Sequence, residues 1–122
     1  MIPARDREVA EADATTGMVR EQAIAEDRVW VGLVRMAPGR PSGWHHHGDY
    51  DTYIYVQSAN VRMEFGPGGE EVVEAGPEDF IHVPKHLVHR EMNATDEEGS
   101  VVLMRVGSGP PVINVDGPAA SD

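Results

Sequence analysis

The stretch from Ser42 to Val56 reads SGWHHHGDYDTYIYV, and it places three consecutive histidines ahead of an alternating aromatic and β-branched run. Side chains two apart on a strand point to the same face. His45 and His47 would therefore share a face, and His46 would point away. Two imidazoles placed in this way can converge on one metal ion at about 2.1 Å from each nitrogen, and Asp51 offers an oxygen ligand nearby. The same residues are also consistent with a solvated polar loop that leads into a strand.

Short runs of the same kind recur along most of the chain, separated by glycine, proline and acidic residues. This pattern predicts strands over residues 18–25, 29–37, 43–47, 52–58, 60–65, 70–75, 79–83, 87–92, 100–106 and 112–115. An open sheet of so many short strands would leave bare edges. We therefore predict an all-β fold that closes into a barrel or a two-sheet jelly roll, and such barrels hold ligands at their mouths.

The length of 122 residues predicts a single domain. We expect the β-barrel to span residues 18–115. Residues 1–17 are polar and densely charged, which indicates a flexible N-terminal arm or a short exposed helix, with an arm that crosses onto a second subunit as the alternative. Residues 116–122 are expected to form a frayed C-terminal tail.

The composition limits the partners and the chemistry of the protein. With 10 Lys and Arg against 21 Asp and Glu, the net charge of −11 opposes binding to nucleic acid and to anionic membranes. No apolar stretch approaches the roughly 20 residues of a membrane helix, and residues 1–11 do not resemble a secretory signal, so we expect a cytoplasmic protein. The absence of cysteine restricts any metal site to nitrogen and oxygen ligands.

The other three histidines, His82, His86 and His89, form a second group. Their spacing is consistent with one side of a surface helix that begins at Pro84. The run DFIHV before this proline instead favours a strand, a tight turn and a return strand that carries His89.

Two spaced motifs contain most of these histidines. In the first, Gly39 is followed by five residues, His45-x-His47, three residues and Asp51. In the second, Gly76 is followed by seven residues, Pro84-Lys85-His86, two residues, His89, three residues and Asn93. Together these motifs resemble those of the cupin superfamily. The chain is similar to its small single-domain members over residues 39–93 by motif and over residues 18–115 by strand pattern.

The resemblance implies a closed double-stranded β-helix, or jelly-roll barrel, that holds a divalent metal ion. It implies that the ligands are His45, His47, Asp51 and His89, with Fe(II), Mn(II), Ni(II), Co(II) or Zn(II) as candidate ions. Asp51 is shorter than the glutamate usual in the family. The first motif of the family ends in a glycine, and Ala59 stands in that place here. The family spacing counted back from Ala59 puts Thr52 in the place of the acid, which would leave a site of three histidines.

The resemblance also implies a small-molecule substrate or ligand and a homodimer. We expect a dioxygenase-like, metal-dependent enzyme that acts on an enolic, phenolic or carboxylate-bearing molecule. The alternatives are a non-redox isomerase, decarboxylase or cyclase, and a non-catalytic binding protein. The sequence identifies no catalytic residue.

Several side chains near the motifs have weaker assignments. Tyr53 and Tyr55 lie two and four residues after Asp51, so they point to the same face of the strand as Asp51. They either line the substrate pocket or pack as ordinary barrel aromatics. His86 stands where the family has a turn glycine, and an added ligand or acid/base group is the alternative to a turn role. Glu91 is expected to point away from the face of the last ligand and to form a surface salt bridge.

Overall fold

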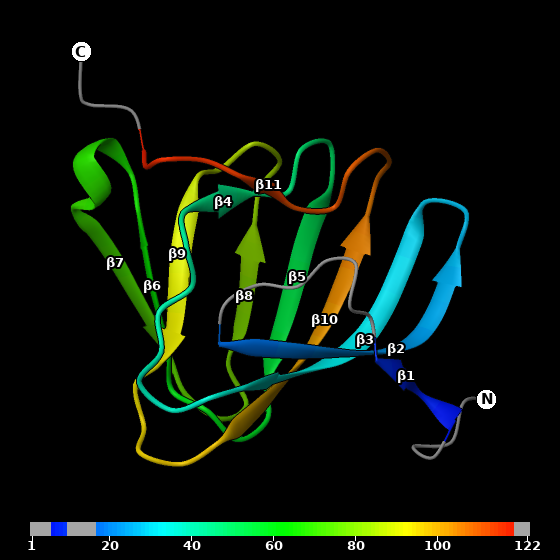
Figure 1. Ribbon diagram of the computed structural model, residues 1–122, viewed down its shortest axis with the longest axis horizontal. Coiled ribbons are helices and arrows are strands. Elements are labelled where there is room, and N and C mark those ends of the chain that lie inside the picture. Colours follow the sequence, from blue (N-terminus) through cyan, green and yellow to red (C-terminus); the bar gives the residue numbers. More distant parts are fainter. Residues whose placement is uncertain (1–5, 10–16, 119–122) are drawn as a thin grey trace.

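The protein consists of two β-sheets (Figure 1). The structure is a computed structural model, and it describes residues 6–9 and 17–118. The first sheet has the strand order β1-β2-β3-β10-β5-β8, and the second has the order β11-β4-β9-β6-β7. The strands are β1 (Glu8–Val9), β2 (Met18–Glu26), β3 (Val29–Met36), β4 (His45–His46), β5 (Asp51–Val56), β6 (Val61–Phe65), β7 (Glu71–Ala75), β8 (Phe80–Val83), β9 (His89–Asn93), β10 (Gly99–Val106) and β11 (Ile113–Asn114). These strands pair antiparallel throughout.

The hydrophobic core lies between the two sheets, because alternate residues of each strand face inward. On β5 the buried positions are Thr52, Ile54 and Val56, and on β10 burial alternates in the same way. The apolar core consists of Val34, Met36, Ile54, Val56, Ala59, Val61, Met63, Ala75, Ile81, Val83, Val101 and Leu103. Burial of these side chains is the main favourable contribution to folding.

The prediction of an all-β jelly-roll fold is confirmed, and each predicted strand is present with ends that differ by no more than a few residues. The predicted segment 43–47 is shorter in the structure, since only His45 and His46 belong to β4. Strand β1, which pairs with β2, was not predicted. Residues 1–5 and 10–16 of the expected N-terminal arm, and residues 119–122 of the expected tail, lie outside the described residues.

The second histidine group lies on a strand, a turn and a return strand, as the DFIHV run predicts. His82 belongs to β8 and His89 begins β9. His86 lies in the turn between them with a φ of 62°, in the left-handed region where glycine is favoured. The turn therefore keeps a glycine-like backbone conformation with a histidine in place.

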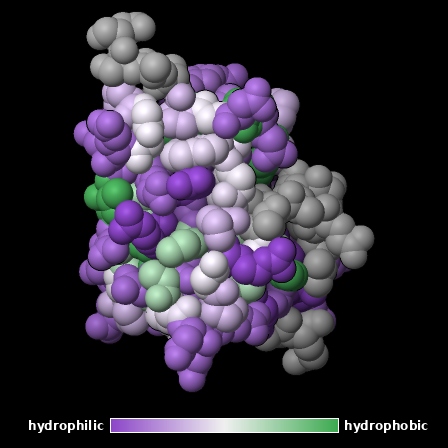
Figure 2. All heavy atoms as spheres, turned by 60° about the vertical axis from the view of Figure 1, so that its left-hand side comes forward, coloured by the Kyte–Doolittle hydropathy of each residue, from purple (hydrophilic) through white to green (hydrophobic). Residues whose placement is uncertain are grey.

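Figure 1 shows β4 and β11 crossing one end of the fold, near the ends of β5, β8 and β10. The face in Figure 2 is mainly hydrophilic, with hydrophobic spheres in small groups, as the excess of acidic residues leads one to expect. No helix in the described part of the chain is long and apolar enough to span a membrane.

The core assignment predicts a difference between two valines of β10. Val101 is 3% exposed in the core, whereas Val106 is 44% exposed. Val101→Ala should lower the free energy of unfolding by about 1–3 kcal/mol, because it removes buried methyl groups and leaves a cavity. Val106→Ala should change it by less than about 0.5 kcal/mol. Urea denaturation measures both values, and equal losses would contradict the assignment.

Candidate metal centre

Three histidines come together inside the fold. His45 on β4 is paired directly with His89 on β9, and both side chains are 0% exposed. His47 follows two residues after His45 and is 3% exposed. One ring nitrogen from each residue lies within 4.8 Å of those of the other two. Ligand atoms of one ion lie at most about 4.2 Å apart when each is about 2.1 Å from it, so a small contraction would bring the three imidazoles onto a common ion.

The orientation of each ring is fixed by its Nδ1 atom. The Nδ1 atoms of His45, His47 and His89 lie 2.9 Å from the backbone carbonyl oxygens of Gly43, Pro111 and Leu87, respectively. A carbonyl only accepts hydrogen bonds, so each Nδ1 carries the proton that it donates. Each neutral ring therefore has its lone pair on Nε2, which is the form that binds a metal ion.

A buried carboxylate lies next to two of these rings. Glu91, two residues after His89 on β9, has its Oε2 atom 3.1 Å from His89 Nε2 and its Oε1 atom 3.6 Å from His45 Nε2. Two ligands of one ion at angles of about 90–110° lie about 3.0–3.4 Å apart. The separations around Glu91 are thus close to those of neighbouring metal ligands.

Several atoms of this cluster lie close together without forming hydrogen bonds of good geometry. His45 Nε2, His89 Nε2 and Glu91 Oε2 are buried and form no hydrogen bond within the described ranges. Buried polar atoms are normally satisfied, because an unmade hydrogen bond is costly. The residues present fit a divalent ion, which would give these orphaned atoms a common partner.

The predicted fourth ligand, Asp51, lies elsewhere. Ile54 and Val56 occupy the inner face of β5, so Asp51 is on the outer face, where its Oδ1 atom is 2.9 Å from His82 Nε2. Thr52, the alternative in the acid's place, is on the inner face and 0% exposed, and its hydroxyl has no hydrogen-bond partner among the residues described. The structure thus brings together three of the four predicted ligands and separates Asp51 from them.

The predicted pocket tyrosines are also on the outer face of β5. Tyr53 is 40% exposed and stacks on His82, with ring centroids 4.8 Å apart. The ring centroids of Tyr55 and Phe80 lie 4.9 Å apart. Both tyrosines point to the same face of β5 as Asp51, so they lie on the outside of the barrel and do not line its interior.

The remaining histidines are placed on the outside as well. His46 points away from its neighbours, as the alternation predicts, and its Nδ1 atom accepts a hydrogen bond from the Gly48 N–H. His86 is 63% exposed and pairs with Asp49. None of the outward-facing histidines contributes to the buried cluster.

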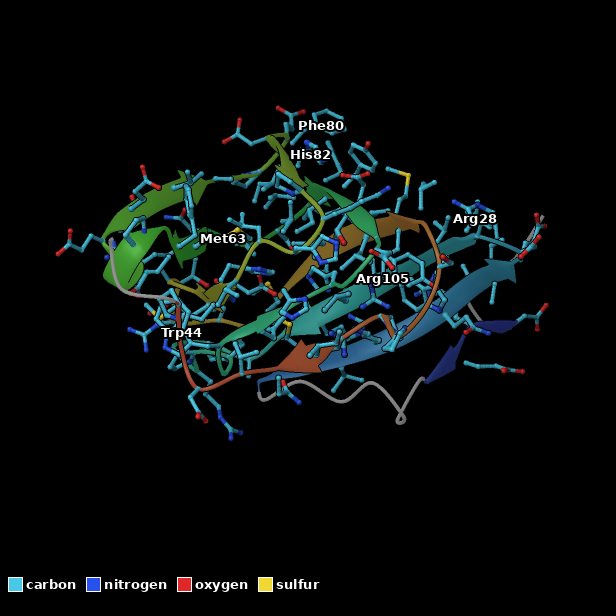
Figure 3. All side chains as sticks on the ribbon, turned by 90° about the horizontal axis from the view of Figure 1, so that it is seen from above. Arg28, Trp44, Met63, Phe80, His82 and Arg105 are labelled. Atoms are coloured by element: carbon cyan, nitrogen blue, oxygen red, sulfur yellow. The ribbon has the colours of Figure 1, made fainter. Side chains whose placement is uncertain are left out.

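Two polar residues of the interior were missed by the sequence analysis. Glu91 was expected to point away from His89, but residues two apart on a strand share a face, and this spacing was the available signal. Arg105 lies between the sheets (Figure 3) and is 1% exposed. It is paired with Thr52 across β5 and β10, and its guanidinium carbon is 4.9 Å from the centroid of the Trp30 ring. Its inward position follows from the alternation of β10 with Val101 and Leu103.

The buried charges influence one another. Burial would lower the pKa of His89, but attraction to Glu91 outweighs it and raises this pKa above 6.5. Burial would raise the pKa of Glu91, but attraction to His89 and His45 holds it well below 4.5. Burial, together with repulsion by His89, lowers the pKa of His47 to about 3. The metal-free centre therefore contains a carboxylate and one imidazole with a strong tendency to hold a proton.

The fold and this buried cluster define a cupin. The sequence profile of the Cupin domain family matches residues 32–105, and the chain belongs to this family. No curated protein matches the sequence.

Solved structures of similar fold are numerous. The polyketide cyclase RemF from Streptomyces resistomycificus matches with a TM-score of 0.76 and 18% identity, over 94% of this chain and 84% of that one. KdgF from Halomonas sp. matches with a TM-score of 0.69 and 16% identity, over 88% and 95%. An oxalate oxidase matches with a TM-score of 0.68 and 16% identity, over 88% of this chain but 60% of its own length. At these identities the likeness shows the shared fold.

A pair of carboxylate-to-amide substitutions tests which acid serves the centre. Glu91→Gln should weaken binding of Zn(II) or Ni(II) by about 10- to 100-fold, because it removes a negative charge beside two of the rings. Asp51→Asn should leave the affinity within about twofold, since its carboxylate lies on the outer face. Isothermal titration calorimetry measures both. A larger loss in Asp51→Asn than in Glu91→Gln would assign the ligand role to Asp51.

The pKa shifts predict how metal affinity depends on pH. Because the pKa of His89 is raised above 6.5, an incoming ion must displace a proton from this ring near neutral pH. Below that pKa the affinity should fall about tenfold or more per pH unit, while His47 competes for protons only near pH 3. Calorimetry in buffers of different ionisation enthalpy should detect release of about one proton near pH 6.5. A pH-independent affinity from about pH 5 to 8 would contradict this prediction.

Proposed function

We propose that the protein is a divalent-metal-dependent cupin enzyme that acts on a small molecule bearing an enolate, phenolate or carboxylate oxygen, with dioxygenase-like chemistry. The observation that carries this proposal is the set of three buried imidazoles whose Nδ1 atoms are bound to backbone carbonyls. Such rings are held with Nε2 directed into the cluster, where two of these nitrogens are buried beside the Glu91 carboxylate. A cluster of this kind has a clear role in metal binding and none in ordinary core packing.

The residues of the chain would prepare the site in three ways. His45, His47 and His89 would hold the ion at fixed positions on the inner face of the barrel. Glu91 would add a negative charge that lowers the net charge of the centre. The burial of these side chains excludes bulk water and strengthens electrostatic interactions with a bound substrate.

The bound ion would supply Lewis acidity toward a substrate oxygen and, if redox-active, a means to use dioxygen. Imidazole and carboxylate ligands suit Fe(II), Mn(II), Ni(II), Co(II) and Zn(II), and we propose that the native ion is one of these. Cysteine is absent from the sequence, so the site has no preference for soft thiophilic ions.

A non-redox reaction is the second candidate, and Glu91 supports it. Its carboxylate is buried beside two of the rings, so it lies within reach of a substrate bound at the ion and could accept a proton from it. A metal-dependent isomerase, decarboxylase or cyclase would use the same four residues, with Glu91 as the base rather than as a ligand. One of the similar structures is a polyketide cyclase, which is consistent with this candidate.

The function is tested by metal content and oxygen consumption. The purified protein should contain about one divalent ion per chain by elemental analysis. The His45→Ala/His47→Ala double variant should lose it while remaining folded by circular dichroism, because both positions supply ligands. Protein loaded with Fe(II) or Mn(II) should consume oxygen in the presence of one or more members of a panel of enolic and phenolic compounds.

Each result separates the candidates. Turnover of a panel compound by zinc-loaded protein, with no oxygen uptake by any loaded form, would replace dioxygenase-like chemistry by Lewis-acid chemistry. Retention of the full metal content in the double variant would refute the metal centre itself. The Glu91→Gln variant then distinguishes the roles of the carboxylate, since loss of turnover with metal retained identifies a base.

A further inference from the structure

A cleft opens where the two sheets end next to each other. Strand β7 is the last strand of one sheet and β8 is the last strand of the other, and no ladder joins them in the described part of the fold. The cleft has a volume of about 550 Å³, which is within the range of small-molecule sites. Its walls are Met63 and Phe65 of β6, Val73, Glu74 and Ala75 of β7, Asp79, Phe80, Ile81 and His82 at β8, and Pro84 and Leu87 of the following turn.

The inner wall of the cleft is apolar and open to solvent. Val73 is paired with Met63 across β6 and β7, so both side chains lie on the same face of the sheet. Met63 is 2% exposed, as expected for the core, but Val73 is 41% exposed. On the opposite side of the cleft, Phe80 is 75% exposed, and Figure 3 shows it beside His82 at the outside of the fold. Val73 thus exposes apolar surface inside the cleft, and Phe80 exposes it at the outer rim.

The cleft shares a wall with the metal centre. Phe65 is paired directly with His89 across β6 and β9, and Met63 is paired with Glu91 in the same ladder. Paired side chains on one face lie about 5 Å apart at their Cβ atoms. Leu87, at the other side of the cleft, supplies the carbonyl that accepts the hydrogen bond from His89 Nδ1. A ligand in the cleft would therefore lie one side chain away from the metal ligands.

The charged groups around the cleft do not favour a charged ligand. Glu74 is paired with Arg62, and the Asp79 carboxylate accepts a hydrogen bond from the Gly76 N–H. His82, the single basic residue among the cleft walls described, is bound to Asp51. The part of a ligand that occupies the cleft is therefore neutral and apolar.

We propose that the cleft between β7 and β8 binds the aromatic ring system of the substrate and directs a donor oxygen of the same molecule past Phe65 to the metal centre. This inference rests on the proposed function, because it assigns the apolar half of that site. It assigns to the substrate an apolar ring system that fits the cleft and a phenolate or carboxylate oxygen at one end, and a two-ring phenol is a small probe of this class. The substrate enters from the side of the barrel, between the free sheet edges.

Two neighbouring valines of β7 provide a matched test. Val73 faces the cleft, and Val72 faces the opposite side of the strand with a similar exposure of 42%. The probe is 2-naphthol, titrated by calorimetry into the full-length chain from which metal has been removed with EDTA. Val73→Trp should weaken binding by about tenfold or more, because the indole fills the cleft, whereas Val72→Trp should leave it within about twofold.

A second pair, Val73→Lys and Val72→Lys, keeps the test valid if an indole disturbs the fold, since both positions are exposed and tolerate a polar side chain. Val73→Lys should weaken 2-naphthol binding, because it places a charge in an apolar site. Equal effects at the two positions, or no binding by the unmodified chain up to the solubility of 2-naphthol, would overturn the proposal.

A second probe separates this inference from the proposed function. 3-Hydroxy-2-naphthoate carries the same ring system with two donor oxygens, and Zn(II)-loaded protein should bind it about tenfold more tightly than metal-free protein does. The His45→Ala/His47→Ala variant should lose this gain and keep its affinity for 2-naphthol. If zinc gives no gain although the intact protein binds both zinc and 2-naphthol, the connection of the cleft to the metal centre is refuted. If the protein does not bind zinc while 2-naphthol still binds in a Val73-dependent manner, the proposed function fails and the aromatic cleft stands.

Discussion

The hydrogen bonds from three imidazole Nδ1 atoms to backbone carbonyls are the constraint on which the interior of this protein depends. Each bond fixes both the tautomer and the direction of a ring, so the Nε2 atoms converge without any contribution from a ligand. The carbonyls belong to loops that precede or follow strands of one sheet, so the sheet itself sets the geometry. A metal ion bound by these rings would meet a site that is already arranged for it.

The buried carboxylate of Glu91 adds an electrostatic cost to this arrangement. A carboxylate in a buried position is costly unless positive charge or hydrogen-bond donors compensate for it. In the metal-free protein a proton on His89 provides part of that compensation, which explains why the pKa values of the two groups move in opposite directions. An ion at the same place would supply the compensation more fully, and its binding would displace the proton from His89.

Much of the fold and part of the site could be predicted from the sequence. The period of two in the apolar pattern located the strands, and the spacing of His45 and His47 correctly placed the two rings on one face. The same reasoning gave the relative orientation of Asp51, Tyr53 and Tyr55 but not the side of the sheet that they occupy. Ile54 and Val56 decide which side faces the core, because burying these two aliphatic side chains stabilises the folded state more than burying Asp51 and the tyrosines would.

Glu91 and the cleft show what the sequence pattern could not supply. Glu91 lies two residues from both His89 and Asn93, so the sequence places all three on one face of the strand. A charged residue flanked on that face by two polar residues resembles a surface position until its burial is known. The cleft depends on how far the edges of β7 and β8 separate, which is a property of sheet curvature and of side chains distant in sequence. Neither quantity has a local signal in the chain.

The bond between His47 and the carbonyl of Pro111 joins residues 64 positions apart. Strand β11 pairs with β4 on the side opposite β9, so the C-terminal segment that carries Pro111 lies beside the histidines. His47 acquires its final orientation only after the segment that contains Pro111 has folded back. A change that detaches the segment around Pro111 from β4 would therefore leave the His47 ring without its fixed direction, although His47 is far from that segment in sequence.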